Sequence, residues 1–296
     1  MGGHPHAPHA EDSRTLLQDI ERYLACPHCA QQLTLDGRTL RCAAGHSFDQ
    51  AKQGYVSLLA GDAHTGTGDT AGMVAARSDF LAAGHYRPIA DALAEAAVAA
   101  GAAGPAGPGE GLVADLGAGT GYYLAHVLAR TGGTGAALDI SKYALRRAAK
   151  AHPRIGAVVC DAWRPLPLRD ASADLLLNVF APRNGPEIRR VLRPGGRLLL
   201  VSPTSRHLRE LVAALGLLSV DEDKERRIDE KLSPWLTRTD RVELEFRLSL
   251  SRADAAAVVA MGPNAWHTDA GKLAATLAEL PEPVEVTGSV QVTTYG

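Results

Sequence analysis

The chain has 296 residues, 46% of them hydrophobic, so it can bury a sizeable core in one large or two modest domains. Its formal net charge of −2 excludes a strong overall attraction to nucleic acid, and any RNA contact must come from a local basic patch. No apolar run reaches the roughly 18 residues of a membrane span, and no secretory signal opens the chain, so we expect no membrane partner, a cytoplasmic location and reduced cysteines.

At the N-terminus we expect a disordered tail, residues 1–20, followed by a small Cys/His module, residues 21–60. Two residues separate the first pair of ligands, three separate the second, and twelve lie between the pairs. Zinc favours four ligands in a tetrahedron, and each pair can come from one tight turn. A hairpin with an Asp36-Gly37 turn between the pairs predicts a zinc ribbon with a closed, structural metal site; unligated thiols are the alternative. The predicted ligands are Cys26, Cys29, Cys42 and His46.

Residues 61–108 are predicted to hold a mobile Gly-rich loop, a helical segment at 73–100 broken near Pro88, and a linker. From residue 109 to 296 strands and helices alternate, which is typical of a parallel, doubly wound sheet. We expect strands at 111–116, 135–140, 156–160, 172–179, 197–202, 241–250 and 284–294, and helices at 120–131, 141–151, 185–192, 252–260 and 268–279.

A glycine-rich segment, Asp115-Leu-Gly-Ala-Gly-Thr-Gly121, follows the first of these strands and opens a helix. Its glycines allow a sharp turn and close approach of a cofactor. Asp139 ends the next strand, where a carboxylate can accept ribose hydroxyls, and Asp161 ends the third, where it could meet an adenine amine. The spacing differs from Gly-x-Gly-x-x-Gly and favours S-adenosylmethionine over a dinucleotide; a fold without cofactor is the remaining alternative. The predicted cofactor-binding residues of the segment are Asp115, Gly117, Gly119, Thr120 and Gly121.

Taken together, these features resemble the RlmA-type 23S rRNA (guanine-N1)-methyltransferases over nearly the whole chain beyond residue 20. The segments that carry the resemblance are Cys26–Asp49, Ala51–Leu59, Ala76–Tyr86, Asp115–Tyr123, Leu138–Lys142, Phe180–Pro182, Arg193–Gly196, Arg206–Leu208 and Met261–Trp266. The resemblance implies an α/β class I S-adenosylmethionine-dependent methyltransferase fold, Rossmann-like and doubly wound, with an N-terminal zinc ribbon. It also implies a homodimer and a 23S rRNA hairpin at the peptide exit tunnel as substrate. The Gly/Ala-rich composition and extended N-terminus are similar to the branch that includes a tylosin-resistance enzyme.

The resemblance also places Gly119 and Thr120 against the cofactor, with Tyr86 and His207 closing over it. An aromatic side chain filling the core and a histidine at a helix start are the alternatives for the last two. No general base stands out from the sequence, although His267 and Asp269 are conceivable.

RNA binding requires local positive charge, which the sequence offers in three places. The candidate residues are Lys142, Arg146, Arg147, Lys150 and Arg154; Arg183, Arg189, Arg190 and Arg193; and Arg38 and Arg41. Tyr55 or Trp266 could stack on a base. Two other functions stay open: a small-molecule methyltransferase with an appended ribbon, and a non-catalytic zinc-ribbon RNA-binding protein.

Overall fold

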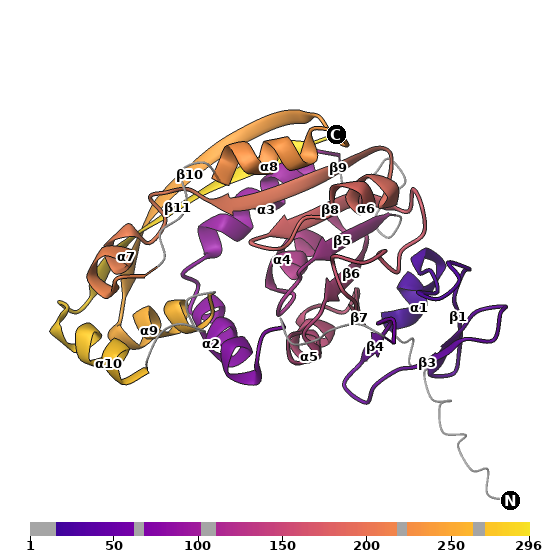
Figure 1. Cartoon of the computed structure of the whole chain (residues 1–296), viewed down its shortest axis with the longest axis horizontal. Helices are drawn as coiled ribbons and strands as arrows, with labels where there is room; N and C mark the ends of the chain where they lie inside the picture. The colour runs from indigo at the N-terminus through magenta and orange to yellow at the C-terminus, as the bar shows by residue number, and fades with distance from the viewer. Residues whose placement is uncertain (1–15, 62–67, 102–110, 218–223, 263–269) are drawn as a thin grey trace, which may run out of the picture.

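The protein, seen here in a computed structural model, is built on one eight-stranded sheet (Figure 1). The structure describes residues 16–61, 68–101, 111–217, 224–262 and 270–296. The strand order is β10-β11-β9-β8-β5-β6-β7-β4. The strands are β4 (Tyr55–Ser57), β5 (Leu112–Leu116), β6 (Thr134–Asp139), β7 (Ile155–Val159), β8 (Ala173–Val179), β9 (Leu192–Pro203), β10 (Arg238–Leu250) and β11 (Val284–Tyr295).

The six strands from β4 to β9 run parallel, and β11 and β10 add an antiparallel hairpin beyond β9. Every residue of β5 and β7 is buried, because helices and the ribbon cover both faces of the sheet; this explains their continuous apolar runs. The chain proceeds outward from β5 to β6 and β7, then returns to β8 and β9 on the other side of β5. This order confirms the predicted doubly wound sheet.

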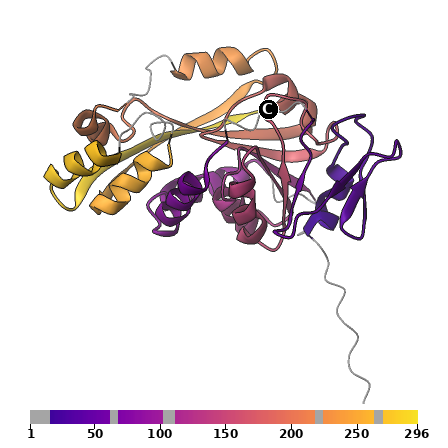
Figure 2. The same ribbon diagram turned by 60° about the horizontal axis from the view of Figure 1, so that its bottom comes forward.

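Helices pack on both faces of the sheet, and Figure 2 shows α8 on one side with α2 and α5 on the other. The helices of the first face are α2 (Ala71–Ala82), α3 (Arg87–Ala99), α4 (Tyr122–Thr131), α5 (Lys142–Ala151), α7 (Arg209–Leu215), α9 (Arg252–Ala260) and α10 (Ala270–Glu279). Those of the second face are α1 (Leu16–Ile20), α6 (Gly185–Val191) and α8 (Lys224–Leu232). Helices α7 and α8 lie in a stretch for which the sequence predicted no element.

The helical segment breaks where its sequence allows it to end and restart. Helix α2 starts after Thr70, whose hydroxyl accepts the Met73 N–H, and it ends before Gly84, which has a φ of +84°. Helix α3 restarts with Pro88 in its first turn, where proline lacks only an N–H that would have no helical partner. The break therefore lies at residues 83–86, between the end of α2 and the start of α3, just before Pro88.

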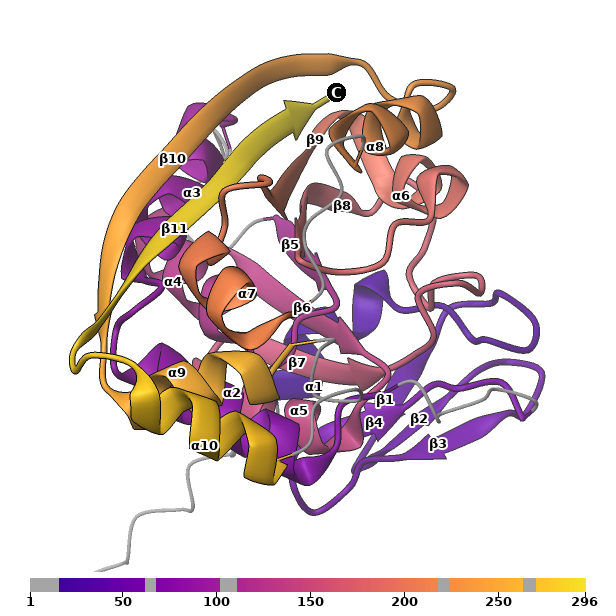
Figure 3. The same ribbon diagram turned by 60° about the vertical axis from the view of Figure 1, so that its left-hand side comes forward.

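The ribbon is a three-stranded antiparallel sheet made of β1 (Thr34–Asp36), β2 (Thr39–Arg41) and β3 (Ser47–Asp49). Its hairpin turn has Gly37 and Arg38 at its centre, one residue later than predicted, because Gly37 supplies the positive φ of +60°. The next strand, β4, leaves the ribbon and pairs with β7 at the edge of the large sheet (Figure 3).

The predicted tail is wrong over its last five residues. Residues 16–20 form helix α1, because Leu17 and Ile20 are apolar, fully buried and packed against the sheet. A Cβ at Gly156 of β7 would come within 2.4 Å of the Ile20 side chain, so the helix and the strand touch directly. No helix within the described ranges is long and apolar enough to cross a membrane.

Candidate functional site

The four predicted metal ligands converge in the ribbon. The three cysteine sulfurs and a ring nitrogen of the histidine all lie within 4.8 Å of one another in the group Cys26, Cys29, Cys42 and His46. The Cys29 and Cys42 sulfurs are 3.6 Å apart, and the His46 Nδ1 lies 3.6 Å from the Cys26 sulfur and 3.3 Å from the Cys42 sulfur. A tetrahedron with zinc–sulfur bonds of about 2.3 Å has edges of about 3.8 Å, so the donor set fits zinc.

The chemistry of this site is that of a structural metal centre. Burial raises the pKa of the Cys42 thiol, but hydrogen bonds from the backbone and ring of His46 outweigh it and lower that pKa to about 6. A lowered pKa favours the thiolate, which is the form that binds zinc. Four protein ligands leave no open coordination position, so the metal holds the two turns together and activates no water.

The second candidate site lies at the carboxyl ends of the parallel strands, where β5 and β8 are neighbours. The chain reverses its direction across the sheet between these two strands, and such a switch point leaves a crevice for a ligand. The loops that flank this crevice are 117–121, after β5, and 180–182, after β8.

The glycine loop has the backbone that its sequence predicts. Gly117, Gly119 and Gly121 have φ values of +79°, +53° and +77°, which L side chains rarely adopt. A Cβ at Gly117 would lie 2.4 Å from the Cβ of Ala181, in the loop after β8. The two loops are therefore in contact, and the missing side chain of Gly117 is what allows them to approach so closely. Thr120 instead lines a hollow between α2, α4 and α5, next to His126.

Asp139 and Asp161 stand at the ends of the next two strands, as predicted. The two carboxylate oxygens of Asp139 accept the N–H groups of Gly119 and Ser141, each at 2.8 Å. Burial raises the pKa of Asp139 despite these hydrogen bonds. Asp161 is half-buried, and its Oδ1 accepts the Trp163 N–H at 2.9 Å, which orders the turn after β7.

Asp115 is the most unusual group of the site. It is 1% exposed, and neither of its carboxylate oxygens has a hydrogen-bond partner. Burial, and then the charge of Asp139, raise the pKa of Asp115 to about 8. A buried carboxylate without donors is costly, so this position fits a ligand that brings a cationic donor of its own.

Tyr86 and His207 meet across the crevice, although they are 121 residues apart. The Tyr86 hydroxyl lies 3.0 Å from the His207 Nε2, and the His207 Nδ1 accepts the Ser289 N–H at 3.1 Å. Because Nδ1 is an acceptor, the ring proton is on Nε2, which then donates to the Tyr86 oxygen. Tyr86 is 3% exposed, and burial raises its pKa. Phe180 completes the cluster, with its ring centre 6.2 Å from that of Tyr86 and 5.9 Å from that of His207.

Arg77 and Phe180 are neighbours of the site that sequence reasoning did not single out. Arg77 forms an ion pair with Asp69 and donates to the Met261 carbonyl at 2.5 Å. Its guanidinium lies 3.6 Å from the position of a Cβ on Gly119, so it borders the glycine loop 117–121. Both residues fall in segments that carry the family resemblance, which was the available signal.

Two arginines of the second predicted basic cluster, Arg190 and Arg193, lie away from the carboxyl ends of the strands. Arg190 donates to Glu187, Asp170 and two backbone carbonyls, and Arg193 pairs with Asp174. Asp174 also accepts the N–H of Leu112, the first residue of β5. These arginines thus lie at the amino ends of the strands, because α6 carries the chain back across the sheet before β9 begins.

The cluster on α5 is better placed. Lys142, Arg147 and Lys150 are exposed, and the charged groups of Lys142 and Arg146 lie over the Tyr143 ring at 5.5 and 5.3 Å. The helix starts directly beyond Asp139, and a Cβ on Gly54, just before β4, would lie 3.3 Å from Ala149 of α5. Positive charge therefore extends along a helix that starts beside Asp139 and touches the segment leading from the ribbon.

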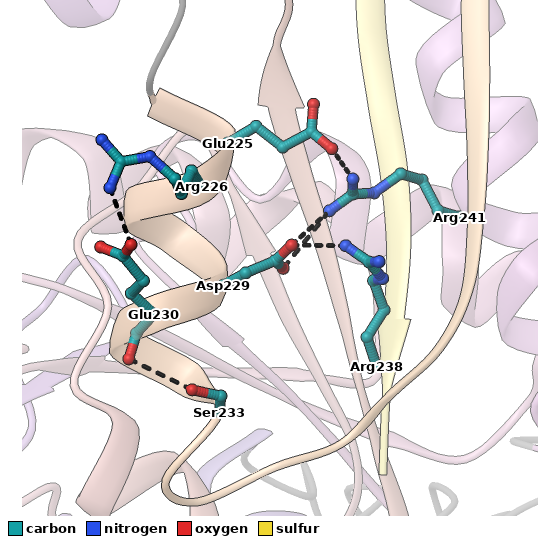
Figure 4. A pocket seen from close by; sticks show the side chains of 7 residues that line it. All are labelled: Glu225, Arg226, Asp229, Glu230, Ser233, Arg238 and Arg241. Carbon is teal, nitrogen blue, oxygen red and sulfur yellow. Dashed lines mark hydrogen bonds and ion pairs between the residues drawn. The ribbon is translucent and has the colours of Figure 1, made fainter.

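A separate hollow between α8 and β10 is lined by charged groups that satisfy one another. Arg241 pairs with Glu225 and Asp229, and Arg238 also reaches Asp229 (Figure 4). The Tyr295 hydroxyl donates to Asp229 as well, and Tyr295 lies opposite Leu198, in the middle of β9.

Three predicted residues lie outside the described part of the chain, namely Trp266, His267 and Asp269. The other predicted stacking residue, Tyr55, is half-buried in β4 and packs against the core.

Comparison with known proteins identifies the two parts of the chain. Residues 24–63 match the family model of the N-terminal zinc ribbon of RlmA, and residues 114–200 match that of a methyltransferase domain. A 23S rRNA (guanine(748)-N(1))-methyltransferase of Streptomyces fradiae is 51% identical over 277 residues, which cover 93% of this chain and 97% of the relative. A protein of Micromonospora griseorubida, provisionally named a 23S rRNA (guanine-N(1)-)-methyltransferase, is 52% identical over 291 residues, covering 94% and 98%. The chain therefore belongs to the RlmA-type family of 23S rRNA (guanine-N1)-methyltransferases.

Proposed function

We propose that the chain transfers a methyl group from S-adenosylmethionine to N1 of a 23S rRNA guanine, at the position equivalent to guanine 748. The observation that carries this proposal is that β4, which follows the zinc ribbon, pairs with the same large sheet that positions the glycine loop 117–121, a loop typical of methyltransferases. The relative of Streptomyces fradiae, which carries that position in its name, supports the choice of base.

The residues of the crevice match the parts of S-adenosylmethionine, which supplies an electrophilic methyl group when bound. Asp115 pairs with the α-ammonium group of the cofactor, which would satisfy its two unpartnered oxygens. Asp139 accepts the ribose hydroxyls, and Asp161 accepts the adenine amine. The loop from Gly117 to Gly121, Thr120 included, follows the cofactor closely, although Thr120 also lines the hollow between α2, α4 and α5. Tyr86 and His207 cover the cofactor.

The acceptor imposes the second requirement. Guanine N1 carries a proton and is normally paired, so the base must be unpaired or extruded before it can be methylated. Transfer would form the bond from N1 to the methyl group, break its bond to the sulfur and so leave S-adenosylhomocysteine, while the N1 proton passes to solvent. The protein contributes alignment and stabilisation of the charge that develops at O6. The Nε2–H of His207 and the hydroxyl of Tyr86 are polar groups at the crevice that can take part in this alignment.

The RNA hairpin is held, in this proposal, between the ribbon and the basic face of α5. Lys142, Arg147 and Lys150 contact its phosphates, with Arg41 contributing from the ribbon. Arg38 has a structural task, since it donates to the carbonyls of Gln50 and Ala51. A homodimer would place two ribbons around one RNA, and light scattering of the purified protein tests this assembly.

Primer extension on 23S rRNA tests the proposed reaction, because N1-methylguanine blocks reverse transcription. RNA from a host without such an enzyme is compared with RNA from the same host expressing the chain or its Asp139→Asn variant. We expect a new stop at the equivalent of position 748 in the exit-tunnel hairpin, only with the unaltered chain. No stop on the 23S rRNA, from a protein that binds the cofactor, would refute the assignment and favour a small-molecule acceptor.

The biological role follows from the same modification. We propose that methylation at the exit tunnel protects the cytoplasmic ribosome against tylosin-type macrolides, as the resemblance implies. The growth of the expressing host in tylosin measures this directly, and an unchanged inhibitory concentration in cells with fully methylated rRNA would contradict it.

A further inference from the structure

We propose that Phe180 is the surface on which the extruded guanine stacks, and that it sets the position of N1 in front of the methyl donor. This inference rests on the proposed function, because it concerns how the same site holds its RNA substrate. It assigns a role to a residue that borders the cofactor loop but has no place among the cofactor contacts described above.

Phe180 is exposed where a large apolar side chain is normally buried. Its side chain is 40% exposed, although it directly follows β8, a strand whose last five residues are all buried. Its backbone has a φ of +53°, in a region that is unfavourable for residues other than glycine. Strained residues persist where the surrounding structure determines them, and they are frequent at functional sites.

The surrounding contacts hold the Phe180 turn in place. Asn178, which is fully buried, donates from its side-chain amide to the Pro182 carbonyl at 2.8 Å and to the Leu116 carbonyl at 3.3 Å. The Phe180 N–H donates to the Val201 carbonyl at 3.1 Å. The turn is therefore tied to β5 and β9 at once, and the ring is presented by a fixed backbone.

The turn also lies against the cofactor cradle. Ala181 is the residue that a Cβ on Gly117 would strike, so the neighbour of Phe180 is in contact with the first glycine of the loop. Loops 117–121 and 180–182 are the two sides of the switch point between β5 and β8. A planar ligand on Phe180 would consequently lie beside the cofactor, as methyl transfer requires.

The Phe180 ring is also supported from within the site. The rings of Tyr86 and His207 pack near it at tilts of 47° and 34°, which leaves part of the phenyl ring accessible. Unpaired bases are commonly stacked on aromatic side chains, and stacking accepts any base because each has a π-face. The hydrogen-bonding groups of Tyr86 and His207 then lie beside a base placed on Phe180.

Three other exposed aromatics in the described ranges are less suited to this role. Tyr143 is 38% exposed, but it lies on α5 and the charged groups of Lys142 and Arg146 lie over its ring. Trp163 is 63% exposed but follows β7, two strands from the switch point. Trp235 is 46% exposed and lies against Gly185, at the start of α6. Trp235 therefore provides a matched control for removal of an exposed ring.

A double-substitution experiment on protein and RNA tests the proposal. The binding of a 23S rRNA hairpin transcript is measured for the unaltered protein and for F180A, F180W and W235A, with S-adenosylhomocysteine bound to prevent turnover. Each protein is tested with guanine and with an abasic nucleotide at the target position. Cofactor affinity, measured by calorimetry, shows that each variant is folded.

We expect F180A to weaken binding of the guanine hairpin by roughly 10-fold, while the abasic hairpin binds both proteins equally. F180W should restore most of the loss, and W235A should match the unaltered protein with either RNA. Equal losses with both hairpins, or no loss with either, would overturn the proposal. An unaltered protein that neither binds nor methylates the guanine hairpin would instead refute the proposed function itself.

Discussion

The buried carboxyl group of Asp115 should give this enzyme two opposite pH dependences. With a pKa of about 8 in the free protein, only about one molecule in eleven carries the carboxylate at pH 7, and about one in a hundred at pH 6. In the proposed function the α-ammonium group of the cofactor pairs with the carboxylate, so binding would release the proton. Affinity for S-adenosylhomocysteine should therefore fall about fivefold from pH 8 to pH 7, almost tenfold from pH 7 to pH 6, and level off above pH 8.

The stability of the cofactor-free protein should change in the other direction. The folded pKa of Asp115 is raised above its unfolded value of 3.8, so its contribution is fully present below that value and is lost as the pH rises towards 8. Around pH 6 the loss is about 1.4 kcal/mol per pH unit, and it halves to about 0.7 kcal/mol per unit at pH 8, so the loss from pH 6 to 8 is about 2.3 kcal/mol. At 1% exposure this value needs little correction for solvent screening.

Calorimetry in buffers of different ionisation enthalpy tests the first dependence, since about 0.9 proton should leave per cofactor bound at pH 7. Urea denaturation at pH 6, 7 and 8 tests the second. Asp115→Asn serves as the control, because it should lose both slopes and bind the cofactor weakly at every pH. A flat affinity for the unaltered protein between pH 6 and 8, or an unaltered slope in the variant, would refute the reasoning.

Three further changes test other parts of the structure. Gly117→Ala should weaken cofactor binding at least tenfold, since the added Cβ would lie 2.4 Å from Ala181. The double variant with Ala181→Gly should recover only part of this affinity, because the φ of +79° stays unfavourable for alanine. Cys42→Ser should release zinc, seen by elemental analysis, and lower the melting temperature by several degrees; full zinc content would contradict the ligand set. The double variant Lys142→Ala, Arg147→Ala should weaken hairpin binding and reduce its logarithmic salt slope by about 2 without changing cofactor affinity.

Local patterns predicted most of the large sheet and the ligands of the metal site. The strands β5 and β7 are buried on both faces, and their apolar runs record this directly in the sequence. Three glycines at positive φ and two carboxylates at strand ends define the cradle, and each can be recognised from its neighbours in the chain. The four zinc ligands lie in two short pairs, so spacing alone identifies them.

Features that depend on contacts distant in sequence could not be predicted in this way. Helix α1 has only five residues, too few for a clear sequence pattern, and it is stabilised by the packing of Ile20 against β7, a contact that is distant in sequence. The position of Arg193 depends on how α6 crosses the sheet, which its local sequence does not encode. The exposure of Phe180 likewise results from a turn tied to two strands, whereas its sequence continues an apolar run.

The attachment of the ribbon to the sheet has a consequence for how a target base is selected. The ribbon region is joined at β4, where Tyr55–Ser57 pairs with β7, and at a bridge between Leu24 and Leu168. Its apolar side chains also share one core with the second face of the sheet. The span between the metal-bound turns and the methyl donor is thus a fixed length of protein. For an RNA bound at the ribbon, only a nucleotide at this distance from the bound segment could reach the methyl donor. The modified nucleotide would therefore be selected by its distance from the ribbon-bound segment as well as by its base.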